Sequence, residues 1–272
     1  MARSLTLFLS CCLLVCSQRI AAQTRMADSA LNFFRVRSNI NYTSARWQIA
    51  IDSALTFDST VATLWQWKGM PYFKNADYAS SMPCYDKAAH YDPNNYLSMR
   101  AFMKAVFAKD YEGGIKDFLT CKEKGYGVGL MDHSYDFFLG LCYKEIGDLS
   151  NAEKYMRQSV DERSKALGKN WVHWNDWFFL GIITMEKKNY KEAIEYFDNC
   201  MVDMKGYPNA LYYKGLCLYN LGKKDKAKEQ MLQAIENIKA GKRSSEDNDF
   251  YVNFPNQVYV ADIEAKLKVL YP

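Results

Sequence analysis

The fold of this chain is decided by two stretches: residues 177–200, WFFLGIITMEKKNYKEAIEYFDNC, and residues 211–234, LYYKGLCLYNLGKKDKAKEQMLQA. The second stretch repeats the order of large and small residues in the first, 34 residues later. The matched positions are Trp177, Gly181, Ala193, Phe197 and Cys200, then Leu211, Gly215, Ala227, Met231 and Ala234. A fixed period of this length predicts stacked helical hairpins rather than a closed globule.

The small residues have a physical reason. Gly181 and Ala193 lie where two antiparallel helices of one hairpin must approach, with their axes about 8–10 Å apart. Trp177 and Phe197 fill the remaining space, and Asn189 marks the turn between the helices. The pattern therefore predicts one helical hairpin for each period.

These residues resemble the tetratricopeptide repeat family, whose pattern has an aromatic residue, Leu-Gly, a turn followed by Tyr, then Ala and an aromatic residue. Looser copies lie upstream, around Gly69, Phe102–Cys121 and Gly140, and the copy at Gly140 precedes Gly181 by 41 residues. We place the excess of seven residues between Arg163 and Trp174, in a lengthened second helix or loop. The resemblance implies an all-α, right-handed α-solenoid of stacked helix-turn-helix repeats.

The domain organisation follows from this phasing. We expect a degenerate first repeat over 28–61, with Trp47, Ile51 and Ala54 on its second helix, and repeats over 62–241. A polar linker is expected over 242–254. A C-terminal capping helix is expected over 255–272, with Tyr259, Ile263, Leu267 and Leu270 on one apolar face that seals the last repeat.

Composition agrees with a helical fold that buries a continuous core. Hydrophobic residues make up 49% of the chain, and there are 6 prolines and 14 glycines. No segment alternates apolar and polar residues as a half-buried strand does. We expect almost no sheet.

Residues 1–22 have the pattern of a secretory signal peptide: basic Arg3, an apolar run of about 11 residues and a small-residue end at Ala21-Ala22. The run is too short for a permanent membrane span, which needs about 20 residues. We therefore expect an exported protein, periplasmic, envelope-associated or secreted, that begins near Gln23. Cys16 leaves a lipoprotein as the weaker alternative, because Val15 stands where lipoprotein signals carry a small residue.

Charge argues against nucleic acid as a partner. The formal net charge is +4, and loss of Arg3 and Arg19 with residues 1–22 lowers it to +2. Lysines alternate with acidic residues along the second helices, without the basic stripe that phosphate contacts need.

Five of the eight cysteines lie beyond residue 22: Cys84, Cys121, Cys142, Cys200 and Cys217. Disulfides are the alternative in an oxidising compartment. The candidate pairs, Cys121 with Cys142 and Cys200 with Cys217, would be offset by roughly 7 Å along the helices. Because bridged Cα atoms lie within about 7 Å in total, we favour small buried packing residues.

The sequence offers no clear catalytic or metal-binding constellation, and we expect no cofactor. His90, His133 and His173 are far apart in the chain, and none has a second histidine or a cysteine four residues away. Cys84 and His90 lie six apart on one helix and would not face each other. We therefore expect a protein that is not an enzyme, with an unrecognised catalytic site as the least favoured alternative.

The first helices carry the candidate binding residues. In the family the face three before, one after and four after the phased glycine lines a concave groove that binds peptides, so the resemblance implies partner binding there. Apart from Gln66 and Lys144, this face is apolar or tyrosine. The expected partner-binding residues are Met70, Phe73, Met99, Met103, Phe137, Leu141, Phe178, Ile182, Met185, Tyr212, Leu216 and Tyr219.

A helix that is apolar on two sides must be buried on both. Two coverings stay open: an apolar peptide or helix of a partner laid in the groove, or the chain itself, through a tight superhelix or through its own ends. The first makes the protein a non-enzymatic interaction scaffold that binds another protein or a peptide. The second makes it a self-packed structural subunit of an envelope or secretion assembly. The partner and the oligomeric state are not specified by the sequence.

Overall fold

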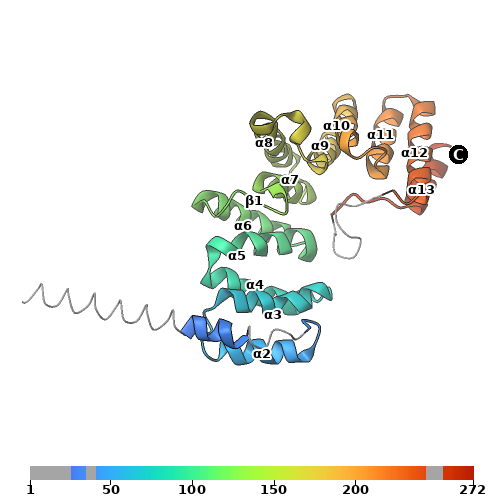
Figure 1. Cartoon of the computed structure of the whole chain (residues 1–272). Helices are drawn as coiled ribbons and strands as arrows, with labels where there is room; N and C mark the ends of the chain where they lie inside the picture. Colours follow the sequence, from blue (N-terminus) through green and yellow to red (C-terminus); the bar gives the residue numbers. More distant parts are fainter. Residues whose placement is uncertain (1–25, 35–40, 243–253) are drawn as a thin grey trace, which may run out of the picture. The chain divides into compact units, whose positions relative to one another are not determined.

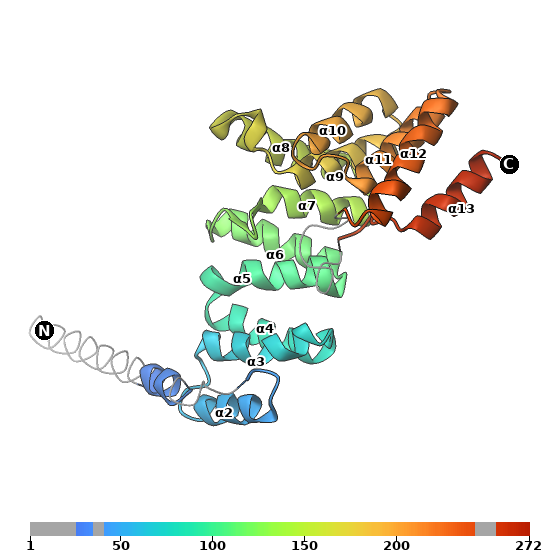
Figure 2. The same ribbon diagram turned by 45° about the vertical axis from the view of Figure 1, so that its right-hand side comes forward.

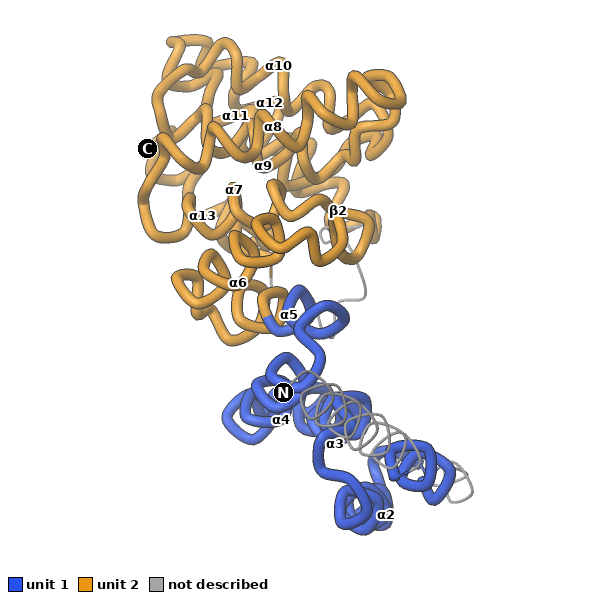
Figure 3. The backbone as a smooth tube through the Cα atoms, turned by 90° about the vertical axis from the view of Figure 1, so that its left-hand side faces the viewer, with its two compact units in different colours: residues 1–100 blue, residues 101–272 orange. Residues whose placement is uncertain are grey.

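The computed structural model describes residues 26–34, 41–242 and 254–272. This part of the chain is helical except for a hairpin of two short antiparallel strands, β1 (Gly129–Leu130) and β2 (His133–Ser134). The expectation of an all-α fold with almost no sheet is confirmed. The chain divides into two compact units, residues 1–100 and 101–272, with the boundary inside helix α5 (Pro93–Phe102) (Figure 3).

Unit 1 contains a helix over residues 26–34, then α2 (Ala45–Leu55), α3 (Ala62–Lys74), α4 (Tyr78–Tyr91) and most of α5 (Figure 1). Its core joins the first two helices to the start of α3. Phe34 lies at its centre, with ring centroids 4.9 Å from both Trp47 and Trp67. Ile51 and Ala54 are fully buried in the same core, as expected for the second helix of a first repeat.

Unit 2 continues α5 into a π-helical turn, η1 (Met103–Ala108), and helix α6 (Tyr111–Lys124). After the β hairpin come α7 (Tyr135–Glu145), α8 (Leu149–Leu167) and a 3₁₀ turn, η2 (Lys169–Trp171). Then follow α9 (Trp174–Glu186), α10 (Tyr190–Asp203), α11 (Pro208–Asn220), α12 (Lys224–Lys239) and α13 (Val260–Leu270). Each helix from α6 to α12 packs against the next along the chain. The seven extra residues predicted after Arg163 lie at the end of α8 and in η2.

The close helix contacts follow the predicted small residues. A Cβ atom added to Gly181 would lie 2.6 Å from the Phe197 ring, and one added to Gly215 would lie 2.9 Å from the Met231 side chain. Real Cβ atoms do not approach neighbours this closely, so α9 and α11 can reach their partner helices only because these positions lack a side chain.

The turns inside the hairpins share a local design. A residue with positive φ precedes the N-cap of the second helix: Ala76 (58°), Lys109 (58°), Gly147 (83°), Lys188 (65°) and Gly222 (75°). Three of the caps are aspartates that accept a backbone N–H three residues on: Asp77 from Ser80, Asp110 from Gly113 and Asp148 from Asn151. A cap of this kind satisfies one of the donors that the helix start leaves open.

The C-terminal helix is shorter than predicted. It begins at Val260, not at residue 255, because the backbone of Asn256 is left-handed (φ 64°) and the backbone N–H of Val258 bonds elsewhere. Ile263 is fully buried and Leu267 and Leu270 pack beside it against α11 and α12, so the capping role is present. Tyr259 does not share that face: it precedes the helix and is 64% exposed.

Several expectations fall on residues that the structure does not describe. The signal peptide over 1–22 and nearly all of the linker over 242–254 lie outside the described residues. No helix of the described part is both long and apolar enough to cross a membrane. Cys84, Cys121, Cys142, Cys200 and Cys217 are all buried and form no disulfide, which agrees with packing residues.

Candidate functional site

The first helices of three successive hairpins, α7, α9 and α11, contact one another in series within unit 2. Residues 254–258, just before α13, lie against them (Figure 2). We call the side of α7, α9 and α11 that meets this segment the first-helix face. Its contacting residues are His133 beside α7 and Phe137, Lys144, Phe179, Asn209 and Tyr213 on the helices. We call residues 254–258 the C-terminal segment.

Phe254 is the aromatic anchor of the C-terminal segment. Its ring centroid lies 6.0 Å from that of Phe137, 6.1 Å from that of Phe179 and 6.4 Å from that of His133. The pairs with Phe137 and His133 are edge-to-face, at 69° and 67°, an arrangement that aromatic pairs prefer, and the pair with Phe179 is tilted by 47°. Phe254 therefore joins α7 to α9 through an aromatic cluster.

Asn256 and Val258 are held by polar contacts. The Lys144 ammonium donates to Asn256 Oδ1 at 2.5 Å, and Asn256 Nδ2 donates to the Tyr213 hydroxyl at 3.4 Å. The backbone N–H of Val258 donates to Asn209 Oδ1 at 3.3 Å. Asn209 is itself fixed, because its Nδ2 donates to the Tyr207 hydroxyl at 3.0 Å. Residues 254, 256 and 258 thus contact α7, α9 and α11, the first two through their side chains and the third through its backbone N–H.

The first-helix face is buried at these contacts. Asn209 is fully buried and the Lys144 side chain is 8% exposed, with Glu145 Oε1 at 2.5 Å and Glu186 Oε1 at 3.9 Å from its ammonium. Burial raises the pKa of Tyr213 to about 12, against the opposing hydrogen bond from Asn256. Hydrogen bonds in such surroundings are stronger than at the surface, and an unmade one costs more.

None of the twelve predicted partner-binding residues is fully exposed. Six are buried: Met103, Phe137, Leu141, Phe178, Ile182 and Tyr212. Six are half-buried: Met70, Phe73, Met99, Met185, Leu216 and Tyr219. Of the two coverings that the sequence leaves open, the chain's own covers the aromatic positions of unit 2, since Phe254 meets Phe137 and Tyr207 and Tyr213 meet Phe178. Contact of a partner with these residues stays a prediction.

Sequence reasoning found Phe137, which contacts Phe254, but missed Phe179, Asn209 and Tyr213. Phe179 and Tyr213 each stand one position after a predicted residue, Phe178 and Tyr212, so the side that meets the segment is turned from the predicted one. Asn209 was not singled out, although a polar residue in the first turn of an otherwise apolar helix is a usable signal. Phe254-Pro255, an aromatic residue before a proline, is a second signal, because proline keeps the preceding residue extended.

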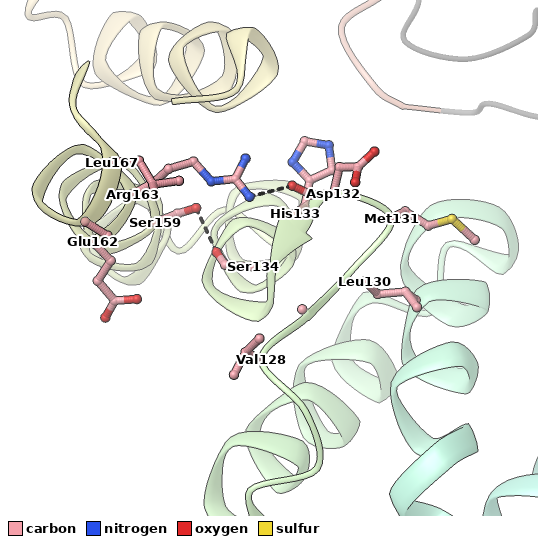
Figure 4. Close-up of a pocket in the computed structure, with 12 residues that line it drawn as sticks. Val128, Leu130, Met131, Asp132, His133, Ser134, Ser159, Glu162, Arg163 and Leu167 are labelled. Atoms are coloured by element: carbon pink, nitrogen blue, oxygen red, sulfur yellow. Dashed lines mark hydrogen bonds between the residues drawn. The ribbon is translucent and has the colours of Figure 1, made fainter. Parts of the chain in front are cut away.

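A second feature adjoins the first-helix face through His133, which belongs to both. The β hairpin and the end of α8 enclose a cavity of about 490 Å³, lined by Val128–Ser134 and by Ser159, Glu162, Arg163, Ala166 and Leu167. Figure 4 shows this hairpin pocket, with Ser134 facing Ser159 and Arg163 reaching the backbone oxygen of Asp132. Its rim is apolar, since Val128 is 90% exposed and Leu167 is 60% exposed.

A buried polar network adjoins this pocket. Ser134 and Ser159 pair at 2.7 Å, Ser159 Oγ donates to Asp176 Oδ1 at 2.6 Å, and His133 Nδ1 pairs with Asp176 Oδ2 at 3.2 Å. Burial by itself would raise the pKa of Asp176, but the hydrogen bonds from His133 and Ser159 outweigh it and hold this pKa below its ordinary value. The Asp176 carboxylate is therefore an anion in the interior.

The histidine prediction needs a correction. His133 and His173 were expected to be far apart, yet their ring centroids are 4.6 Å apart, and each offers a nitrogen within 4.8 Å of an Asp176 oxygen. The reason is topological: β2 precedes α7, His173 caps α9, and α7 and α9 are neighbours. A search for ligands at helical spacing cannot find a pair that adjacent repeats bring together.

Comparison with known proteins agrees with this architecture. Tetratricopeptide repeat models match residues 62–95, 137–165, 177–201 and 209–237, the segments that fold as hairpins α3–α4, α7–α8, α9–α10 and α11–α12. The chain belongs to the tetratricopeptide repeat family. The hairpin of α5, η1 and α6 lies between the matched segments. None of the curated proteins matches the chain.

Solved structures with the same fold include three that cover most of the chain. PilW, a type IV pilus biogenesis factor, is 14% identical, with 84% of this chain and 96% of PilW covered and a TM-score of 0.58. PilF of Pseudomonas aeruginosa is 16% identical, with 92% and 99% covered and a TM-score of 0.56. YrrB, a tetratricopeptide repeat protein with an unusual peptide-binding site, is 16% identical, with 71% and 92% covered and a TM-score of 0.51. Because the sequence identities are this low, the likeness to these structures establishes the fold alone.

Tetratricopeptide repeat proteins are generally protein-interaction scaffolds, because stacked repeats present extended surfaces to other molecules. This chain has that architecture in both units.

Proposed function

We propose that this protein is a non-enzymatic interaction scaffold that binds a non-helical segment of a partner protein on the first-helix face of unit 2. The observation that carries the proposal is the C-terminal segment itself, a stretch of chain outside any helix or strand that is seated there. Pockets for side chains combined with a hydrogen bond to the backbone are a usual means of recognising a peptide.

The contacts define the chemistry of the partner segment. A partner residue at the position of Phe254 would place an aromatic ring against Phe137 and Phe179. At the position of Asn256 it would offer an amide or hydroxyl oxygen that accepts a hydrogen bond from Lys144. At the position of Val258 its backbone N–H would donate to Asn209. A partner would carry an aromatic residue, a polar residue two further on and an apolar residue two beyond that.

The C-terminal segment is then a built-in competitor. A tethered occupant acts at an effective concentration on the order of millimolar, so a free peptide must compete against it. Its hold is weakened by Gln257, whose Nε2 is buried without a hydrogen-bond partner within the described part of the chain. An unmade bond of this kind costs about 1–3 kcal/mol, which favours exchange with a better-fitting partner.

The second candidate is a self-packed structural subunit of an envelope or secretion assembly. It is favoured by the full burial of Phe137 and Phe178 by the chain itself. Exposed apolar side chains around the hairpin pocket, among them Val128, Leu167 and Trp171, would then serve as contacts in the assembly.

The test removes two side chains of the C-terminal segment from the first-helix face and supplies a free peptide in their place. The full chain with Phe254→Ala and Asn256→Ala is titrated with a fluorescent peptide, NFPNQVY, copied from residues 253–259. We expect this variant to bind the peptide at least tenfold more tightly than the wild-type chain, as judged by fluorescence anisotropy. Tyr259→Ala is the matched control, because Tyr259 adjoins the segment but is exposed, and it should behave as wild type.

A further change separates the two candidates. Asn209→Ala added to the opened variant should weaken peptide binding again. If the opened variant melts as a folded protein and still fails to bind the peptide, the scaffold proposal is wrong and the structural subunit remains.

Export belongs to the proposal and rests on residues 1–22 alone. The protein from its native host should have an intact mass that begins near Gln23. A mass that retains residues 1–22 in a cytosolic fraction would contradict export, and a diacylated Cys16 would favour the lipoprotein alternative.

A further inference from the structure

Three side chains from two neighbouring repeats meet beside the hairpin pocket. His133 lies on β2, His173 is the N-cap residue of α9, and Asp176 lies in the first turn of that helix. One ligand atom of each lies within 4.8 Å of the others. We propose that His133, His173 and Asp176 bind one divalent transition-metal ion, with zinc as the reference ion.

The residue types and distances suit such an ion. Two imidazoles and a carboxylate are a common ligand set for zinc and its neighbours. With bonds of about 2.0–2.1 Å, two ligand atoms of a tetrahedral zinc lie about 3.3 Å apart. His133 Nδ1 and Asp176 Oδ2 are already 3.2 Å apart, which is the edge that a bound ion requires.

His173 is the ligand that must move. Its Nδ1 accepts the backbone N–H of Asn175 at 3.2 Å, so binding the ion exchanges this cap for a metal bond. The residue is half-buried and stands in the loop between η2 and α9, with its ring centroid already 4.6 Å from that of His133. His173 and Asp176, three residues apart at a helix start, lie on one side of α9.

The surroundings hold the other two ligands in place. Ser159 Oγ donates to Asp176 Oδ1, and Ser159 is in turn paired with Ser134, so the carboxylate is oriented with Oδ2 toward His133. The His133 ring stacks on Phe137 with centroids 3.8 Å apart and planes 14° from parallel. Partners of this kind orient metal ligands and raise affinity about 10–100-fold.

A metal ion would replace protons in the network. His133 now donates Nδ1–H to the Asp176 carboxylate; on binding, that proton leaves to solvent and the nitrogen and the oxygen both bond the ion. Affinity therefore falls as the pH is lowered. Because His133 and Ser159 also line the hairpin pocket, the ion reaches the site from there. Once bound, it ties the hairpin of α7 and α8 to that of α9 and α10.

The experiment is zinc titration of the full, chelator-treated chain at neutral pH, with Co²⁺ absorption to report the ligands. We expect one ion per chain and a higher melting temperature at saturation. His173→Ala should lower the affinity more than 100-fold without unfolding the protein, since the side chain is half-buried. Ser159→Ala should lower it by about 10–100-fold. His90→Ala is the control, because His90 is exposed and lies in unit 1.

Two results would overturn the metal site. One is the absence of stoichiometric binding to the wild-type chain, which would leave a metal-free hydrogen-bond network. The other is binding that His173→Ala and Asp176→Asn leave unchanged, which would place the ion elsewhere. Neither result bears on the proposed peptide binding, because the opened variant with Phe254→Ala and Asn256→Ala retains all three ligands.

Discussion

Helices α3 in unit 1 and α9 in unit 2 occupy the same place in their repeats, yet they are buried to very different extents. In α9, every residue from Asn175 to Thr184 is buried, whereas in α3 only Ala62, Leu64, Gly69 and Pro71 are. Both helices carry a tryptophan four residues before the phased glycine, Trp65 and Trp177. The repeat pattern therefore determines which side packs inside the hairpin, and the neighbours determine whether the other side is covered.

The cover of unit 2 is visible in particular contacts. Helix α9 has α7 and α11 beside it and Phe254 of the C-terminal segment against Phe179. In unit 1, Met70 and Phe73 stand at the equivalents of Ile182 and Met185 and are half-buried. The position of Ile182 is thus a core position in unit 2 and a partly accessible one, Met70, in unit 1, whereas Met185 and Phe73 are both half-buried.

The largest expected effect compares two pairs of predicted partner-binding residues, one pair in each unit. Phe137→Ser with Phe178→Ser removes two rings that are 0% and 1% exposed, and each cavity should cost about 3–5 kcal/mol. Since whole domains are stable by about 5–15 kcal/mol, unit 2 should unfold or express poorly. Met70→Ser with Phe73→Ser, a half-buried pair in unit 1, should cost far less. Circular dichroism melts measure both, and a small equal loss for the two pairs would show that the unit 2 positions are not core.

A smaller effect compares the glycines of the same two helices. Gly181→Ala places a methyl group 2.6 Å from the Phe197 ring, inside a packed core, whereas at Gly69 the nearest atom, Cys84 Cβ, would be 3.0 Å away. Overpacking of this kind costs about 1–3 kcal/mol, and Gly181→Ala should lie toward the upper end and Gly69→Ala toward the lower. Urea denaturation gives both values. Equal losses would mean that the two hairpins are packed with the same closeness.

The acid stability of unit 2 should depend on the Asp176 network. Its folded-state pKa lies below the unfolded value of about 3.9. The unfolded chain therefore binds more protons in that range, so the stability from Asp176 is present above about pH 4 and is lost as pH falls through the folded pKa. Ser159→Ala removes one donor, raises this pKa and should move acid unfolding to higher pH.

Tryptophan fluorescence during acid titration follows this change. The control is Asp52→Asn in unit 1, which breaks the exposed pair of Asp52 with Lys68. Pairs at the surface contribute about 0–1 kcal/mol, so the acid transition should stay where it is. A midpoint that does not move in Ser159→Ala would show that Ser159 does not stabilise the carboxylate.

Much of the fold was predictable because it rests on local spacing. Gly181, Ala193 and Phe197 define a hairpin by distances along one chain segment, and the structure has a hairpin wherever this pattern recurs. The candidate sites depend on contacts between distant segments. Phe254 lies 117 residues from Phe137, and His133 lies 43 residues from Asp176. No period or motif links such pairs, so the C-terminal segment and the histidine cluster could be found only once neighbouring repeats were placed side by side.

The smallest expected effect is that of a reducing agent on the melting temperature, which should not change. Cys84 in unit 1 and Cys121, Cys142, Cys200 and Cys217 in unit 2 form no disulfide. Burial raises the pKa of Cys84, Cys142, Cys200 and Cys217. A disulfide typically adds about 2–4 kcal/mol, so its loss would be plain in a melt, whereas packing thiols should leave the melting temperature unchanged. A thiol reagent should react with all five after unfolding. In the native chain Cys84 should react first, because its position on α4 faces the less covered α3. Equal protection of all five thiols would contradict this and show that the thiol of unit 1 is as well enclosed as those of unit 2.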